Sequence, residues 1–197
     1  MPQWLKADPV QQFDEWFKEV TKAGEPMPEA MTLATAGKDR IPSARMLLLK
    51  EFDSKGFVFY TNYDSRKAEE IDENPVAAMV FHWKKLERQV RIEGSLKKVT
   101  RKESQAYFNT RPRESRLGAW ASPQSTAIPD RETLEKRLDE VRGRFEGQEK
   151  IPCPPNWGGY RLVPERIEFW QGQTARLHDR YVYVKEGRKW KQARLAP

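Results

Sequence analysis

The sequence predicts an α+β domain that is mainly β, with a barrel-like sheet and helices at its periphery. Its 197 residues suit one domain of ordinary size. Several segments have the length and composition of strands. The helical segments between them do not alternate strictly with strands, as they would in a doubly wound parallel sheet. We expect a single domain over residues 1–197, in which residues 1–25 form an N-terminal helical segment and residues 26–197 the barrel with inserted helices.

The helical segments carry recognisable start and stop signals. Asp8 and Pro9 favour a helix start, because Asp caps the first turn and Pro fits within it. Apolar residues then recur at helical spacing until Gly24. Thr100 and Glu103 have the spacing of a capping box. The predicted helices cover residues 9–24, 66–72, 100–111 and 129–145.

Between and after these helices lie segments with strand character. They alternate apolar and polar residues or form short apolar runs, and turn-forming residues bound them. Gly187 marks a hairpin turn before the last of them. The predicted strands are residues 31–36, 43–50, 57–61, 76–83, 88–99, 160–163, 166–170, 177–184 and the segment from residue 190 onwards.

Composition excludes several classes of protein. The chain is 38% hydrophobic and 33% charged and has no apolar run of about 18 residues, so no membrane span is expected. The N-terminus lacks a basic region followed by an apolar stretch, which predicts no signal peptide. The single Cys153 cannot form an intrachain disulfide. A reducing, cytoplasmic compartment fits these features.

The net charge of +7 leaves several ligands open. Nucleic acid, an anionic membrane, small phosphorylated ligands or simply a solvated basic surface each account for such a balance. The chain contains no G-x-G-x-x-G, no Walker loop, no CxxC, no paired histidines and no nucleophile elbow. No metal site is therefore expected, and any chemistry rests on a bound organic cofactor.

Two groups of residues have the chemistry of anion sites. Ser65, Arg66 and Lys67 stand at a predicted helix start, where free backbone N–H groups and two cations would bind a phosphate. Tyr107 and Arg111 are four residues apart and share a helix face, and Ser115 follows just after Pro112. Solvated charges on a capped helix, and a tyrosine packed on an arginine stem, are the structural alternatives.

A third group is more informative. Arg176, His178 and Arg180 alternate along the chain, so an extended segment would project all three to one side. The two arginines disfavour the imidazolium form of the histidine, and Asp179 offsets this effect. Such a cluster suits a phosphorylated substrate and proton transfer. The alternative is the polar face of an edge strand.

These groups occur within longer motifs that resemble the pyridoxamine (pyridoxine) 5′-phosphate oxidase family. The resemblance extends from about residue 8 to the end of the chain. Members of this family often have Asn where this chain has Ala175, and they often have a longer N-terminal arm that helps to cover the substrate. The matching segments are residues 43–50, 60–62, 65–67, 88–94, 107–112 with Ser115, 123–125, 157–160, 168–180 and 194–197.

The resemblance implies a split β-barrel homodimer with two FMN sites at the subunit interface. By resemblance, FMN would contact Arg45, Met46, Leu47, Leu48, Tyr60, Thr61, Arg66, Lys67, Gln89, Gln124, Ser125, Trp170 and Arg180. The substrate would be held by Lys50, Tyr107, Arg111, Ser115, Arg176 and His178, of which Arg176 and His178 would be catalytic.

The activity implied is oxidation of pyridoxamine or pyridoxine 5′-phosphate by O₂ to pyridoxal 5′-phosphate, with H₂O₂ as the second product and ammonia from the amine. Neither nucleic acid nor a membrane is an expected partner. Another FMN- or deazaflavin-dependent oxidoreductase on the same barrel is the main rival. A non-enzymatic nucleic-acid-binding or cofactor-binding module is a weaker one, suggested only by the net charge.

Overall fold

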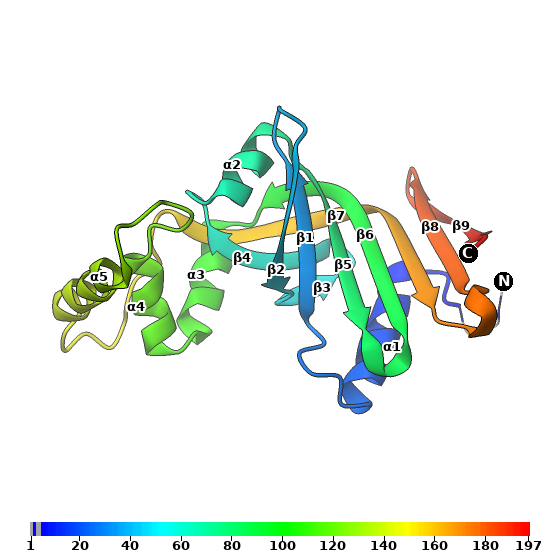
Figure 1. Ribbon diagram of the computed structural model, residues 1–197, viewed down its shortest axis with the longest axis horizontal. Helices are drawn as coiled ribbons and strands as arrows, with labels where there is room; N and C mark the ends of the chain where they lie inside the picture. Colours follow the sequence, from blue (N-terminus) through cyan, green and yellow to red (C-terminus); the bar gives the residue numbers. More distant parts are fainter. Residues whose placement is uncertain (1, 3–4) are drawn as a thin grey trace.

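The computed structural model describes residue 2 and residues 5–197, and its centre is one curled sheet (Figure 1). Strands follow the order β2-β1-β5-β6-β7-β4-β3, and β8 pairs with β7 and β9. Every pairing is antiparallel. The strands are β1 (Ala30–Ala36), β2 (Pro42–Leu48), β3 (Glu51–Asp53), β4 (Gly56–Asn62), β5 (Val76–Trp83), β6 (Arg88–Lys98), β7 (Trp157–Gln171), β8 (Asp179–Glu186) and β9 (Lys189–Leu195).

The helices surround this sheet. Asp8 caps the first helix through its side chain, and Thr100 and Glu103 form the predicted capping box of the third. Two short 3₁₀ helices, η1 (Lys84–Leu86) and η2 (Thr174–Arg176), join strands. The α-helices are α1 (Pro9–Lys22), α2 (Arg66–Glu73), α3 (Arg101–Thr110), α4 (Arg113–Ala121) and α5 (Arg131–Arg144). No helix in the described part of the chain is long and apolar enough to cross a bilayer.

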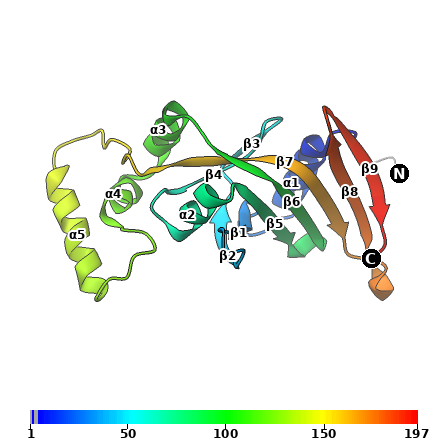
Figure 2. The ribbon, with the colours of Figure 1, turned by 90° about the horizontal axis from the view of Figure 1, so that it is seen from above.

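Strand β7 organises the molecule. One of its edges pairs with β6, while the other pairs with β4 over residues 157–162 and with β8 over residues 166–171. Figures 1 and 2 show β7 running across the molecule, with α3, α4 and α5 at one end and β8 and β9 at the other. The two ends of the fold are therefore joined by a single strand of 15 residues.

Two apolar clusters hold these parts together. In the larger, Phe13 of α1 packs edge-on against Phe57 and Phe81 of the sheet, with ring centroids 5.0 and 5.1 Å apart. In the smaller, Phe108 of α3, Phe145 and Trp157 pack together beneath α4. The second cluster fixes α3 and α4 against the start of β7.

The predicted mainly β fold is confirmed, with some differences in detail. The segments 160–163 and 166–170 belong to one strand, because β7 continues past Pro164 where a register shift opposite Glu93 and Gly94 absorbs the irregularity. Pro112 ends α3 as predicted, but it also occupies the N-cap position of α4, which was not predicted. The short strand β3 was not predicted either.

Candidate functional site

A cavity of about 330 Å³ lies between β2, β4, α3 and the start of β7. A second cavity of about 280 Å³ shares Arg111, Gln124 and Trp157 with it and adds Ser115. The predicted substrate residues Lys50, Tyr107, Arg111 and Ser115 therefore line adjoining space. The first cavity is lined by Met46, Leu47, Leu48, Lys50, Tyr60, Thr61, Tyr107, Arg111, Gln124 and Trp157.

Stacked aromatic rings form one wall of this space. The rings of Tyr60 and Tyr107 stack with centroids 4.0 Å apart, and Trp157 stacks on Tyr60 at 5.4 Å. The Arg111 guanidinium lies 4.7 Å from the centroid of the Trp157 ring. No site role was predicted for Trp157, although it opens one of the segments, residues 157–160, that resemble the oxidase family. Its position next to Arg111 makes it part of the site.

The guanidinium of Arg111 is not fully hydrogen-bonded by the protein. Its Nη1 atom is buried and has no hydrogen-bond partner in the described part of the chain. Burial lowers the pKa of Arg111, and the neighbouring Tyr107 opposes this effect. A half-buried guanidinium with a buried, unpaired donor beside a cavity is suited to an anionic ligand.

Lys67 lies at the start of α2 and is 8% exposed. Its Nζ atom donates to Oε1 of Gln124 at 2.8 Å, Oγ of Ser65 at 3.0 Å and Oγ1 of Thr61 at 3.1 Å. Burial, followed by the charge of Arg45, lowers the pKa of Lys67 to about 8. A bound anion would therefore stabilise the charged form of the Lys67 ammonium group.

Glu70 binds two further cations that were predicted to contact FMN, Arg66 and Arg45. Its carboxylate accepts hydrogen bonds from Nε of Arg66 at 2.8 Å and from Nη2 of Arg45 at 3.3 Å. Thr35 and Ser43 also donate to it. Burial raises its pKa, but these four hydrogen bonds outweigh burial and lower the pKa of Glu70 to about 2. No role was predicted for Glu70, although its spacing of four residues from Arg66 indicates a helical ion pair.

The remaining predicted residues lie elsewhere. Gln89, Trp170 and Arg180 are direct neighbours across β6, β7 and β8. The His178 ring lies 4.6 Å from the Trp170 ring, and its Nδ1 atom accepts a hydrogen bond from the backbone of Gln173 at 3.1 Å. Ser125 lies in an exposed loop next to Gln124.

An extended segment through Arg176, His178 and Arg180, which would project all three to one side, is not present, and the strand predicted from residue 177 begins two residues later. Residues 174–176 form η2, and β8 begins only at Asp179. Ala175 and Arg176 have positive φ angles of 54° and 59°. The chain must reverse direction between β7 and β8, and this tight turn takes the place of the first strand residues. Arg176 therefore projects from an exposed turn, separate from the strand face that carries Arg180.

One chain does not bring the two sets of residues together. Trp157, at the first cavity, and Trp170, beside His178, are 13 residues apart on β7, which is about 40 Å along a strand. Figures 1 and 2 show η2, in orange, toward the end of the molecule opposite α3 and α4. The two sets of residues therefore lie at different parts of one chain.

Comparison with known proteins identifies the family. Residues 17–145 match the family described as pyridoxamine 5′-phosphate oxidase, and residues 157–197 match the pyridoxine 5′-phosphate oxidase C-terminal dimerisation region. The chain belongs to the pyridoxamine 5′-phosphate oxidase family.

Curated relatives are similar over nearly their whole length. The pyridoxine/pyridoxamine 5′-phosphate oxidase of Rubrobacter xylanophilus is 57% identical over 190 residues, covering 96% of this chain and 87% of the relative. The enzyme of the same name from Acaryochloris marina is 53% identical over 193 residues, covering 98% and 88%.

Two solved structures share the fold. PhzG from Burkholderia lata 383, in complex with tetrahydrophenazine-1-carboxylic acid, has a TM-score of 0.94 and 30% identity and covers 100% of this chain and 97% of its own. A pyridoxamine 5′-phosphate oxidase-related, FMN-binding protein from Nostoc punctiforme has a TM-score of 0.76 and 18% identity, covering 98% and 100%. The split-barrel fold expected for this oxidase family is confirmed.

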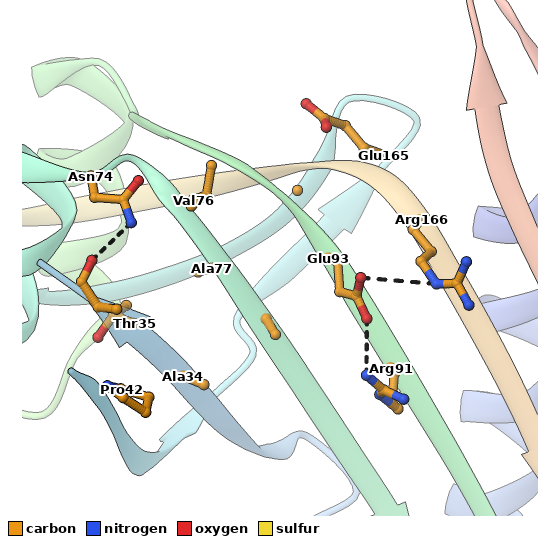
Figure 3. A pocket seen from close by; sticks show the side chains of 13 residues that line it. Ala34, Thr35, Pro42, Asn74, Val76, Ala77, Arg91, Glu93, Glu165 and Arg166 are labelled. Atoms are coloured by element: carbon orange, nitrogen blue, oxygen red, sulfur yellow. Dashed lines mark hydrogen bonds and ion pairs between the residues drawn. The ribbon is translucent and has the colours of Figure 1, made fainter. Parts of the chain in front are cut away.

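This oxidase-family chain also has a wider cavity, of about 580 Å³, that is distinct from the predicted site (Figure 3). Ala34, Val76 and Ala77 form its apolar part, and Glu93 and Arg166 lie on its charged side. None of the predicted site residues lines it. Val76 is 51% exposed there.

The turn at Ala175 allows a first prediction. A residue with a Cβ atom in the left-handed region costs about 1–2 kcal/mol, and glycine avoids this strain. We expect Ala175→Gly to raise the free energy of unfolding by about 1 kcal/mol, measured by urea denaturation. Ala193→Gly is the matched control on exposed strand β9, where glycine should lower stability by about 0.5–1 kcal/mol. Equal destabilisation by both substitutions would contradict strain at Ala175.

Proposed function

We propose that this protein oxidises pyridoxamine 5′-phosphate or pyridoxine 5′-phosphate with O₂, using FMN, and releases pyridoxal 5′-phosphate. The observation that carries the proposal is the pair of cationic groups at the cavity that Gln124 and the stacked Tyr60, Tyr107 and Trp157 rings line. One group contains Lys67 and the other contains Arg111. Two groups of this kind suit two phosphate-bearing molecules bound side by side.

The residues fit FMN in their chemistry. Lys67, Arg45 and Arg66 would hold its phosphate, since all three are cations near the N-terminus of α2. Met46 and Leu48 are 63% and 37% exposed on β2 and offer apolar surface for a planar ring. When bound, FMN supplies a flavin that accepts a hydride equivalent and passes electrons to O₂.

The substrate phosphate would bind to Lys50, Tyr107, Arg111 and Ser115. Lys and Arg only donate hydrogen bonds, and the two hydroxyl groups can donate, so the set is complementary to an oxygen-rich anion. The unpaired Nη1 atom of Arg111 would find its partner there. Held by its phosphate, the substrate would have its ring oriented for reaction at the 4′ carbon.

Arg176 and His178 would reach that substrate from a second copy of the chain. Within one chain they lie far along β7 from Arg111, so a composite site is the arrangement in which all the predicted residues act together. The match of residues 157–197 to a dimerisation region supports a homodimer. A two-fold symmetric dimer would form two such sites. Arg176 and His178 would orient the substrate and stabilise charge at its 4′ substituent and ring oxygen.

A second candidate function follows from PhzG, because its structure matches with a TM-score of 0.94 and was solved with tetrahydrophenazine-1-carboxylic acid. That compound carries a carboxylate and no phosphate. The group of Lys50, Tyr107, Arg111 and Ser115 favours a phosphorylated substrate over it.

The visible spectrum of the purified protein tests the proposal. We expect flavin absorption that bleaches when pyridoxamine 5′-phosphate is added without oxygen and returns in air, with release of H₂O₂ and ammonia. Tetrahydrophenazine-1-carboxylic acid should bleach it far more slowly at equal concentration. A folded protein that stays colourless in excess FMN would overturn the proposal, and bleaching by the phenazine alone would favour the second candidate.

A further inference from the structure

Glu168 is a buried carboxylate in the middle of β7, with 3% of its surface exposed. It has no place in the site as proposed above. Burying a charged group is costly unless charge partners and hydrogen bonds compensate. The charged groups around the Glu168 carboxylate indicate its role.

Three arginines from three strands surround Glu168. Its Oε1 atom accepts a hydrogen bond from Nε of Arg180 at 2.8 Å. Its Oε2 atom lies 3.7 Å from Nη1 of Arg91 and 3.8 Å from Nη2 of Arg166, and it accepts no hydrogen bond in the described part of the chain. The carboxylate is thus hydrogen-bonded to Arg180 alone and only close to the other two.

The register of the strands explains why Glu168 is hydrogen-bonded to Arg180. Arg180 lies directly opposite Trp170, and Glu168 is two residues before Trp170 on the same face of β7. The carboxylate therefore meets the Arg180 side chain diagonally across the β7–β8 pair. The hydrogen bond that Arg180 donates to Glu168 also raises the pKa of Arg180, which favours the charged form of the guanidinium.

Arg180 is held at a second point as well. Its Nη1 atom donates to the backbone oxygen of Ala196 at 2.9 Å. Glu168 and Ala196 together fix Nε and Nη1, and the described contacts of the guanidinium do not involve Nη2. The side chain therefore has a fixed direction, and its Nη2 amino group is left to donate to a ligand beside Trp170.

We propose that Glu168 is a positioning residue for flavin binding, which acts by holding Arg180 in the orientation that meets the cofactor. This inference rests on the proposed function, because it takes Arg180 as a contact of FMN. Glu168 itself touches no ligand in this scheme. It also offsets the mutual repulsion of Arg91, Arg166 and Arg180.

Glu93 offers a matched control. It is a carboxylate in the same cluster, and it pairs with Arg91 at 3.0 Å and Arg166 at 3.9 Å but not with Arg180 (Figure 3). Removing Glu93 perturbs two of the three arginines and leaves the hydrogen bond between Glu168 and Arg180 intact.

The test is the FMN dissociation constant, measured from the free-flavin fluorescence of serially diluted holoprotein. We expect Glu168→Ala to raise the constant about tenfold or more, as a hydrogen bond between charged groups would predict. Glu168→Gln keeps an oxygen for Nε of Arg180 and should raise it less. Glu93→Ala should stay within about twofold of wild type, as expected for a residue outside the contact.

A double-mutant cycle separates positioning from a general structural role. Arg180→Ala alone should weaken FMN binding, and adding Glu168→Ala to it should change the constant by less than about twofold. The inference would be overturned if Glu168→Ala bound FMN as tightly as wild type. It would also be overturned if Glu168→Ala weakened FMN binding equally in the wild-type and Arg180→Ala backgrounds. Either result would leave the proposed function intact. A wild-type protein that binds no FMN would instead overturn the proposed function. Circular dichroism spectra of all variants check that they fold.

Discussion

A heterodimer of one Arg176→Ala chain and one Arg111→Ala chain should have about half of the wild-type activity, although each variant homodimer is nearly inactive. If each site takes Arg111 from one copy and Arg176 from the other, the two substitutions fall together in one site of the heterodimer. The second site then contains only unchanged residues. Co-expression with two different affinity tags isolates the heterodimer for assay.

The homodimers supply the reference values. Each substitution removes a charged contact to the substrate, so we expect each to lower turnover about a hundredfold or more. Arg176→Ala should leave FMN binding within about twofold of wild type, because Arg176 contacts the substrate and not the cofactor. If both residues of a site came from the same chain, every site of the heterodimer would carry one substitution and activity would not recover. That result would reject the composite site.

FMN binding should weaken about tenfold between pH 7 and pH 9 as Lys67 loses its proton. In the free protein the pKa of Lys67 is lowered to about 8. A bound phosphate would favour the ammonium form, so above pH 8 binding must be accompanied by proton uptake. Titrations of flavin fluorescence at a series of pH values measure the effect.

Two variants of Lys67 provide the control. An arginine stays charged across this range, so Lys67→Arg should give a dissociation constant that is nearly independent of pH. Lys67→Met should weaken FMN binding roughly a hundredfold at pH 7 and also remove the pH dependence. A wild-type profile that is flat from pH 7 to pH 9 would show that Lys67 does not hold the phosphate.

The same pKa has a consequence for the stability of the free protein. Lys67 has an ordinary pKa of 10.5 and a lowered one in the fold. Between pH 8 and 10.5 the unfolded chain binds more protons than the folded one at this residue. The contribution of Lys67 to folding stability therefore becomes more favourable as the pH rises through that window.

Local signals in the sequence predicted most of the elements. Asp8, Thr100 and Glu103 cap their helices as expected, because capping depends only on residues within one turn. The missed helix α4 follows directly after Pro112, where a proline that ends one helix also begins the next. Spacing alone does not distinguish these two roles.

The site was less accessible to sequence reasoning. Tyr107 and Arg111 could be paired because helical spacing places them together. The separation of Arg111 from Arg176 could not be predicted, since it depends on how far β7 extends beyond β4. Glu70 and Glu168 were also missed, because a buried carboxylate resembles a surface one until its partners on other elements are known.

The length of β7 also limits which deletions and insertions this protein can tolerate. Both halves of the proposed site are anchored on the same uninterrupted strand, so the strand sets the spacing between them. Deleting one residue from its middle would turn Glu168 and Trp170 toward the core and Phe169 toward the ligand side. In a homodimer a single such deletion would disable both of the proposed catalytic centres at once.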